Sequence, residues 1–310
     1  MKIGKRVAIL DLGTNTFNLL IAEKNGDMLK MIHQSKEISR LGEGGIASNE
    51  IAVTAFERGV SALQKHHQTI QHYRCETIIA FATAAIRDAS NGKLFAEEVK
   101  KQTGIVIETI SGEEEAELIW QGTRHALEIS SPALIMDIGG GSVEFIIGDR
   151  EKIYWKKSYR MGVSRLREQF PFTDPATKNE ISAVKEFIRE FISEISQQAT
   201  TFSIHTLVGC SGSFDSFADI LYQRKTGKKF DDSLVPSYAF VAGELPILLD
   251  DLLGSTHEKR AQWQGLSPMR RDFIAYGALL TKEVMEQCQI KNVFLSAYSL
   301  KEGILFSRVK

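Results

Sequence analysis

The sequence has few cysteines and no excess charge of either sign. Its 310 residues include only three cysteines, Cys75, Cys210 and Cys288, and no CxxC pair. An odd number of widely spaced cysteines argues against a disulfide framework or a zinc site and favours the reducing cytoplasm. The formal net charge of −1 gives no overall attraction to nucleic acid or to an anionic membrane surface. We therefore expect a cytoplasmic protein without a nucleic-acid partner.

Long apolar runs are also missing. No uninterrupted run approaches the ~18 residues that a membrane-spanning helix needs. The N-terminal residues lack the apolar core and cleavage site of a secretory signal peptide. The apolar fraction of 43% and the charged fraction of 25% are typical of soluble globular proteins, and the length suits about two domains. We expect no membrane partner.

Apolar patterning predicts the order of elements. Short apolar runs with β-branched residues predict strands at Arg6–Leu12 and Phe17–Glu23. Ser48 is expected to cap a helix over residues 49–73, and a long helix is predicted over residues 178–198. Three strands, a helix, a strand, a helix, a strand and a helix follow one another, and a similar order begins again at Ala133.

The chain contains an internal repeat. AILDLGTNTFNLLIAE, residues 8–23, resembles LIMDIGGGSVEFIIGD, residues 134–149. Aligned without gaps, the copies match an acid, a glycine and a hydroxyl residue: Asp11 with Asp137, Gly13 with Gly139, and Thr16 with Ser142. Each copy opens a similar succession of elements. The repeat predicts two similar α/β domains, residues 1–125 and 126–310, which face each other across a cleft.

The repeated turn has the chemistry of a phosphate site. Glycines in a strand–strand turn leave backbone N–H groups uncovered, and successive N–H groups form an anion nest. The hydroxyls of Thr14, Thr16 and Ser142 add donors. An acid at the strand end can hold a metal ion that bridges phosphate oxygens. The alternative is a hairpin that merely turns, which two ungapped copies disfavour.

A third glycine-rich segment leads from a strand into a helix. LVGCSGSFDSFADI places Gly212 and Ser213 at the predicted start of that helix. A helix N-terminus reached through small residues can bind an anion. An ordinary strand–helix turn explains the same residues, so both interpretations stay open.

The most acidic run, ISGEEEAELIWQG, lies at a predicted helix start. Ser111 and Glu114 fit a capping box, and the glutamates 113–115 complement the helix dipole. A carboxylate at this place could instead orient and deprotonate a water molecule for in-line attack on phosphorus. Both interpretations remain open from the residues alone.

Two basic features also have alternative explanations. TAAIRDASNG carries Arg87, whose guanidinium suits bidentate phosphate binding, although a surface ion pair with Asp88 or another acid is the commoner role of such an arginine. A basic stretch follows the third strand of the second repeat, and it is either a rail for a polyanion or an exposed face: Lys156, Lys157, Arg160, Arg165 and Arg167.

Eight segments together resemble a known family in the family's order: DLGTNTFNLLIA, LGEGG, ATAAIRDASNG, ISGEEEAELI, MDIGGGSVEFIIG, VGCSGSFDSFA, QGLSPMRRDFIAYGALL and LSAYSLKEGIL. They resemble the exopolyphosphatase and guanosine pentaphosphate phosphohydrolase (Ppx/GppA) family, from residue 6 to about residue 306. The family belongs to the superfamily of actin, sugar kinases and heat-shock chaperone ATPases. The resemblance implies two ribonuclease-H-like α/β domains with mixed sheets flanked by helices and an active site in the interdomain cleft.

The resemblance also implies roles for individual residues. Glu115 matches the catalytic base, and Asp137 and Glu144 match acids that assist metal and water. Magnesium is the expected ion, with Asp11, Asp137 and Glu144 as its candidate ligands. The implied phosphate-binding residues are Thr14, Asn15, Arg87, Gly140, Gly141, Ser142, Gly212 and Ser213.

The implied activity is release of terminal phosphate from inorganic polyphosphate, or of the 5′-terminal phosphate from guanosine pentaphosphate, by a homodimer. Three residues depart from the family pattern. Asn18 stands where histidine is frequent, and Ala297 and Lys301 replace the acid and arginine of S-D-x-x-L-R-E-G. The alternatives are an ATP-dependent kinase or ATPase of the same superfamily, and a non-catalytic sensor of a phosphorylated alarmone.

Overall fold

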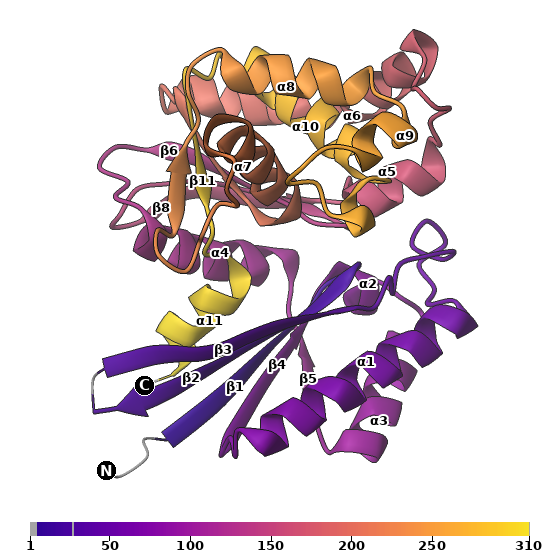
Figure 1. The fold of residues 1–310 in the computed structure, drawn as a ribbon, viewed down its shortest axis with the longest axis vertical. Helices are drawn as coiled ribbons and strands as arrows, with labels where there is room; N and C mark the ends of the chain where they lie inside the picture. Colours follow the sequence, from indigo (N-terminus) through magenta and orange to yellow (C-terminus); the bar gives the residue numbers. More distant parts are fainter. Residues whose placement is uncertain (1–4, 27, 310) are drawn as a thin grey trace. The chain divides into compact units, whose positions relative to one another are not determined.

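Two compact units make up the chain in the computed structural model, which describes residues 5–26 and 28–309 (Figure 1). Unit 1 comprises the residues up to Gly122 together with the segment that begins at Leu300, and unit 2 runs from Thr123 to Ser299. The first crossing between the units lies close to the predicted boundary at residue 125. The second crossing, at Ser299, was not predicted from the sequence.

Unit 1 is built on a five-stranded mixed sheet in the order β3-β2-β1-β4-β5. β1, β2 and β3 pair antiparallel, whereas β4 and β5 run parallel to β1. Its strands are β1 (Lys5–Leu12), β2 (Thr16–Asn25), β3 (Met28–Ile38), β4 (Thr77–Ala82) and β5 (Ile107–Thr109). Its helices are α1 (Val53–His72), α2 (Ala84–Arg87), α3 (Gly92–Thr103), α11 (Leu300–Arg308) and most of α4 (Gly112–Ala126), whose residues from Thr123 onward belong to unit 2.

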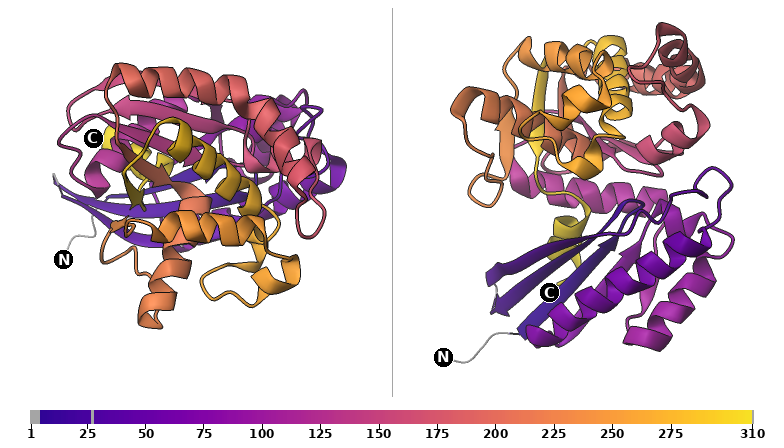
Figure 2. Two further views of the ribbon diagram at one scale, coloured as in Figure 1. Left: turned by 90° about the horizontal axis from the view of Figure 1, so that it is seen from above. Right: turned by 45° about the vertical axis from the view of Figure 1, so that its right-hand side comes forward.

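The last helix, α11, belongs to unit 1, although the sequence places it with residues 126–310. It packs on β1 and β2, on the side of the sheet opposite α1 and α3 (Figures 1 and 2). A Cβ atom at Gly303 would lie 1.7 Å from the carbonyl oxygen of Leu118, so α11 and α4 cross in backbone contact. This close crossing, which only glycine permits, explains why the helix joins unit 1.

Unit 2 contains a six-stranded mixed sheet in the order β10-β11-β9-β6-β7-β8. Its strands are β6 (Ala133–Ile138), β7 (Val143–Gly148), β8 (Ile153–Tyr159), β9 (Thr206–Cys210), β10 (Ser237–Ala239) and β11 (Asn292–Ser296). Its helices are α5 (Val163–Gln169), α6 (Lys178–Thr201), α7 (Ser211–Thr226), α8 (Glu244–Leu253), α9 (His257–Ala261), the 3₁₀ helix η1 (Pro268–Arg270) and α10 (Ile274–Gln287). The helices α8 and α6 both pack against α10, and all three contribute buried residues to one hydrophobic core.

The two sheets confirm the repeat. Reading from the third strand of each unit, β8-β7-β6-β9-β11 reproduces the order β3-β2-β1-β4-β5, with the same antiparallel and parallel pairings. The first strand of each unit, β1 or β6, is buried on both faces of its sheet. Adjacent residues point to opposite faces, and both members of the pairs Ile9 and Leu10 in β1 and Ile135 and Met136 in β6 are fully buried. Mixed sheets flanked by helices are the fold class that the resemblance implies.

The start of α1 differs from the sequence prediction. The helix begins at Val53 rather than near residue 49, and Ser48 does not cap it. Asn49 has a left-handed backbone with φ of 55°. The side-chain amide of Asn91 accepts a hydrogen bond from the N–H of Ile51 (2.9 Å) and donates one to its carbonyl (2.8 Å). This pair of bonds holds the chain extended where the helix was expected.

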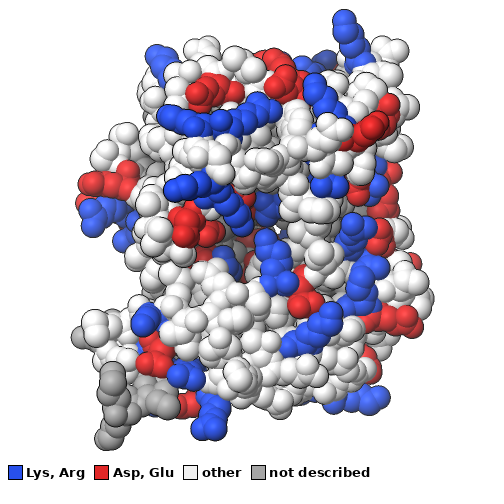
Figure 3. Space-filling view, viewed as in Figure 1, with Lys and Arg blue, Asp and Glu red and all other residues white. Residues whose placement is uncertain are grey.

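Charged side chains of both signs lie on the face in view. Figure 3 shows Lys and Arg interspersed with Asp and Glu over this face. Among the described residues, no helix has both the length and the apolar character required to cross a membrane.

Candidate active site

The two repeated turns have the same backbone hydrogen bond. In unit 1 the N–H of Gly13 donates to the carbonyl of Thr16 at 3.1 Å, and in unit 2 the N–H of Gly139 donates to the carbonyl of Ser142 at 3.1 Å. Each turn connects the first two strands of its sheet. Each lies at the carboxyl ends of the parallel strands, the edge where ligands bind in open α/β sheets.

The acids beside the turns differ between the units. In unit 1, Asp11 lies opposite Asn18, whose side-chain amide donates to its carboxylate at 3.0 Å. In unit 2, Asp137 lies opposite Glu144, and these side chains are 6% and 1% exposed. Directly opposed residues on one face have Cβ atoms about 4.5–5.5 Å apart. Unit 2 therefore holds two buried carboxylates side by side, and unit 1 holds an acid and an amide.

Two serines that the sequence did not single out bind the carboxylates of unit 2. The hydroxyl of Ser299 donates to Oδ2 of Asp137. The hydroxyl of Ser158, which lies opposite Glu144 in β8, donates to its Oε1 at 2.7 Å. Ser158 could have been found from the register of the third strand, whereas no pattern pointed to Ser299.

A buried thiol lies beside Asp137 on the neighbouring strand. Cys210, at the end of β9, pairs with Asp137 in the register. Burial, and then the nearby charge of Asp137, raises the pKa of the Cys210 thiol well above its ordinary value. The thiol therefore stays protonated at neutral pH and does not act as a nucleophile.

The start of α5 covers one edge of the glycine turn in unit 2. The N–H groups of Val163 and Ser164 donate to the carbonyls of Gly139 (3.0 Å) and Gly140 (2.9 Å). The buried side chain of Arg165 donates through Nε to the carbonyl of Gly141 at 3.3 Å. Because peptide N–H and C=O groups point in opposite directions, this packing turns the N–H edge of the turn away from α5. That orientation suits an anion nest.

Gly162, which precedes α5, is expected to tolerate no side chain. A Cβ atom there would lie 2.4 Å from the carbonyl carbon and oxygen of Gly140 and 2.5 Å from the nitrogen of Gly141. We predict that Gly162→Ala displaces the turn and destabilises the protein by about 1–3 kcal/mol, measured by urea unfolding. The matched control is Gly254→Ala, where the nearest atom would be at 3.6 Å. Equal stability of the two variants would contradict this account.

The turn in unit 1 is held by the glycine-rich loop after β3. The carbonyl of Thr14 accepts from the N–H of Gly42 at 3.2 Å. The carbonyl of Asn15 accepts from the N–H groups of Ser39 (3.1 Å) and Arg40 (2.9 Å). Thr14 itself is 4% exposed. The backbone of residues 39–42 thus fixes the carbonyls of Thr14 and Asn15, two of the predicted phosphate-binding residues.

Glu115 and Arg87 meet within unit 1. They follow β5 and β4, which are parallel neighbours, so both lie at the carboxyl edge of the sheet. Nη1 of Arg87 donates to Oε2 of Glu115 at 2.8 Å, and its Nε donates to Oδ1 of Asp88 at 3.2 Å. Glu115 is 7% exposed. The ion pair with Asp88 therefore exists, and it holds an arginine that also contacts the predicted base.

Glu114, which precedes Glu115 at this helix start, has a structural role. The hydroxyl of Ser111 accepts from the backbone N–H of Glu114 at 3.1 Å, which is the Ser111 half of the predicted capping box. The carboxylate of Glu114 pairs with Arg308 at 2.8 Å. Glu114 and Glu115 therefore have different partners, Arg308 and Arg87.

The third glycine segment is fixed by side chains and helices of unit 2. Nη1 of Arg270 donates to the carbonyl of Gly212, and Nη2 pairs with Asp215 at 3.1 Å. A Cβ atom at Gly277 in α10 would lie 2.3 Å from Oγ of Ser213, so this hydroxyl packs against α10. Arg270 lies in QGLSPMRRDFIAYGALL, one of the segments that carry the family resemblance, but the sequence did not identify its role.

The carboxylates of unit 2 suit a magnesium ion. Among the described residues, no three His, Cys, Asp or Glu side chains form a metal-binding cluster. Mg²⁺ is usually held by one or two carboxylates together with water and substrate phosphates, so a cluster of three is not required. Asp137 and Glu144 supply such a pair of oxygen donors.

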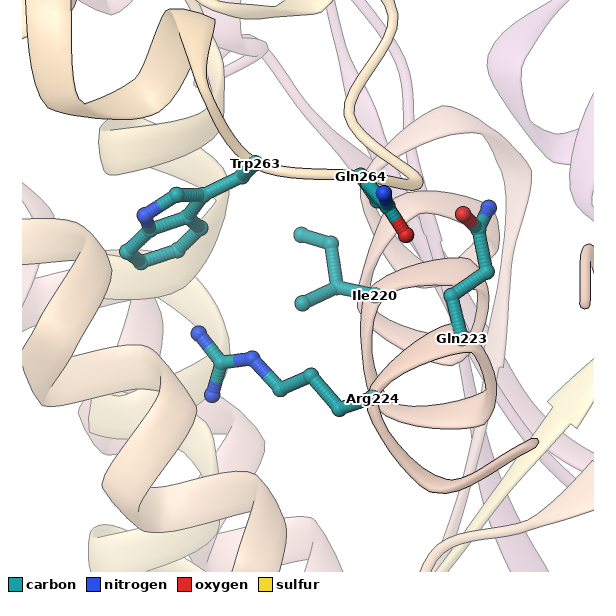
Figure 4. A pocket seen from close by; sticks show the side chains of 5 residues that line it. All are labelled: Ile220, Gln223, Arg224, Trp263 and Gln264. Carbon is teal, nitrogen blue, oxygen red and sulfur yellow. The ribbon is translucent and has the colours of Figure 1, made fainter. Parts of the chain in front are cut away.

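A separate pocket lies in unit 2, outside the predicted site. It has a volume of about 320 Å³ and is lined by Ile220, Gln223, Arg224, Trp263 and Gln264 (Figure 4). The guanidinium carbon of Arg224 lies 5.0 Å from the ring centroid of Trp263. None of the predicted catalytic, phosphate-binding or metal-binding residues lines this pocket.

Comparison with known proteins gives matches over almost the whole chain. The model of the Ppx/GppA phosphatase family matches residues 20–310. "Exopolyphosphatase 2" of Mycobacterium tuberculosis is 29% identical over 97% of this chain and 98% of that protein. A "Guanosine-5'-triphosphate,3'-diphosphate pyrophosphatase" of Pseudoalteromonas translucida is 28% identical over 97% of this chain but 58% of that protein. The crystal structure of an exopolyphosphatase from Cytophaga hutchinsonii is 32% identical, covers 98% of both chains and superposes with a TM-score of 0.94.

Proposed function

Because the chain belongs to the Ppx/GppA phosphatase family, we propose that it hydrolyses the terminal phosphoanhydride of inorganic polyphosphate, of guanosine pentaphosphate, or of both. The observation that carries the proposal is the buried Glu115 at the start of α4, bonded to Arg87. A buried carboxylate and a guanidinium at one sheet edge supply a base for water and a ligand for phosphate oxygens.

The proposed chemistry is in-line attack of water on the terminal phosphorus. Glu115 orients the water and accepts its proton, and the shortened phosphate chain leaves. Arg87 and the turn N–H groups bind the oxygens on which charge accumulates. An arriving phosphate competes with Glu115 for the guanidinium of Arg87.

Asp137 and Glu144 would hold Mg²⁺, which neutralises charge on the phosphate chain when bound. Asp11 remains a predicted ligand. That the turns of the two units share one substrate also stays a prediction, as do the homodimer and the cytoplasmic location.

The matched relatives are named for two different substrates. The chain matches 98% of the mycobacterial exopolyphosphatase, but only 58% of the longer pyrophosphatase named for a guanosine substrate. Both substrates present the same terminal phosphoanhydride, so the site chemistry alone does not separate them.

The test is phosphate release from short polyphosphate, long polyphosphate and guanosine pentaphosphate, each with Mg²⁺ and with EDTA. We expect release from at least one substrate without added nucleotide, and its loss in EDTA. Absence of release from all three would overturn the proposed function. Phosphoryl transfer from ATP to a second substrate would instead indicate a kinase.

A further inference from the structure

Thr123 and Ser299, the first and last residues of unit 2, both bond to residues of one cross-strand pair in the unit 2 sheet. The pair consists of Asp137 in β6 and Cys210 in β9. At the first crossing, the hydroxyl of Thr123 lies 3.5 Å from the Cys210 sulfur, at hydrogen-bond distance. At the second crossing, Ser299 donates to the carboxylate of Asp137. Ser299 is the last residue of unit 2 and immediately precedes α11.

The carboxylate of Asp137 needs an orienting donor. It is buried beside Glu144, and two adjacent carboxylates repel each other. Repulsion alone favours rotation of one carboxylate away from the other. A hydroxyl bonded to Oδ2 opposes that rotation and determines which oxygen faces the neighbouring acid.

We infer that Ser299 is a positioning residue that holds the Asp137 carboxylate in the orientation used for phosphate hydrolysis. The inference rests on the proposed function for its kinetic consequence. Ser158 does the corresponding work for Glu144, since it donates to Oε1 from the neighbouring strand. Both acids of unit 2 are thus oriented by a serine hydroxyl, whereas Asp11 in unit 1 is bonded by the amide of Asn18.

Ser299 also precedes the first residue of α11, which is the N-cap position of that helix. The experiment must therefore distinguish loss of a helix cap from loss of the bond to Asp137. A capping hydroxyl accepts a bond from a backbone N–H, whereas the bond to Asp137 uses the hydroxyl as a donor. Loss of a cap lowers the stability of the helix without a specific effect on turnover. Loss of the orienting bond should lower kcat with little change in KM.

The experiment compares Ser299→Ala, Ser299→Thr and Ser307→Ala in the full chain. Ser307 is the control, because its hydroxyl bonds to the Gly303 carbonyl inside α11. We expect Ser299→Ala to lower kcat by about 10–100-fold with KM changed less than about threefold. Threonine keeps the hydroxyl and should restore most of the turnover, and Ser307→Ala should match the wild type.

Crystal structures of the wild type and of Ser299→Ala give a second measurement that is independent of activity. We expect a rotated or multiply oriented Asp137 carboxylate in the variant and a single orientation in the wild type. A kcat within about twofold of the wild type, or the same single orientation in both crystals, overturns the inference. If the wild type releases phosphate from none of the substrates, the proposed function fails. The orientation of the Asp137 carboxylate in the two crystal structures then tests by itself whether Ser299 positions that carboxylate.

Discussion

Replacing Glu115 by glutamine is expected to leave the chain folded and to lower phosphate release by about 10²–10⁴-fold. Glutamine has nearly the same shape, and its amide oxygen still accepts the bond that Arg87 donates at 2.8 Å to the native carboxylate. The partly buried guanidinium therefore keeps an acceptor, and stability should change little. What is lost is the ability to take a proton from the attacking water. Steady-state phosphate release and thermal unfolding measure the two effects separately.

Glu114→Gln is the matched control for this substitution. Glu114 is the preceding residue of the same helix turn, but its carboxylate is bound to Arg308 and its side chain is 37% exposed. Turnover of this variant should equal that of the wild type. Wild-type turnover in Glu115→Gln would show that another group activates the water. An equal loss in both variants would show that the acidic helix start acts through its overall charge.

The repeated turn could be predicted because its causes are local. Glycine and small hydroxyl residues between two apolar strands allow few other conformations. The structure places the same 3.1 Å bond in both copies, at Gly13 and at Gly139. The strands β4 and β9 run parallel to the first strand of their unit. They were predicted from short apolar runs, which are typical of a buried strand. For these reasons the repeated turn and the α/β character of the two units followed from the sequence, and the resemblance to the family implied the mixed sheets.

The assignment of α11 could not be predicted, because a helix sequence shows an apolar face but not the sheet that this face covers. Its partner is determined by the contact of Gly303 with Leu118, residues that are far apart in the chain. The start of α1 was missed for a similar reason. Asn91, forty residues away, holds Ile51 extended. Long-range hydrogen bonds of this kind leave no periodic signal in the sequence.

The predicted site residues and their orienting partners differ in the same way. Glu115 and Asp137 lie in motifs whose spacing indicates their chemistry. Ser299, which orients Asp137, falls on a position that the family ending S-D-x-x-L-R-E-G leaves open, and it is 162 residues away in sequence. The cover that α5 provides for the glycine turn was also missed, because its short segment shows little helical periodicity. Groups that orient a site are selected by geometry, and many residue types satisfy that geometry.

Asp137→Asn is the second substitution with a large expected effect. Asparagine can still accept the Ser299 hydroxyl bond, so the carbonyl oxygen keeps its orientation while one negative charge is removed. If Asp137 and Glu144 together hold Mg²⁺, a loss of several kcal/mol in the transition state lowers turnover by about 10²–10³-fold. The concentration of Mg²⁺ at half-maximal phosphate release should rise by more than about tenfold. Titration of phosphate release with Mg²⁺ measures both quantities.

The repeat supplies the matched variant, Asp11→Asn. Asp11 occupies the same position in unit 1, but its cross-strand neighbour is Asn18, so that pair carries one carboxylate where unit 2 carries two. A divalent cation is attracted more strongly to two adjacent carboxylates than to one. Asp11→Asn should therefore change the Mg²⁺ requirement less than Asp137→Asn does. Equal shifts in the two variants would mean that both units bind the ion equally. An unchanged Mg²⁺ requirement in Asp137→Asn would show that the carboxylates of unit 2 do not bind the metal.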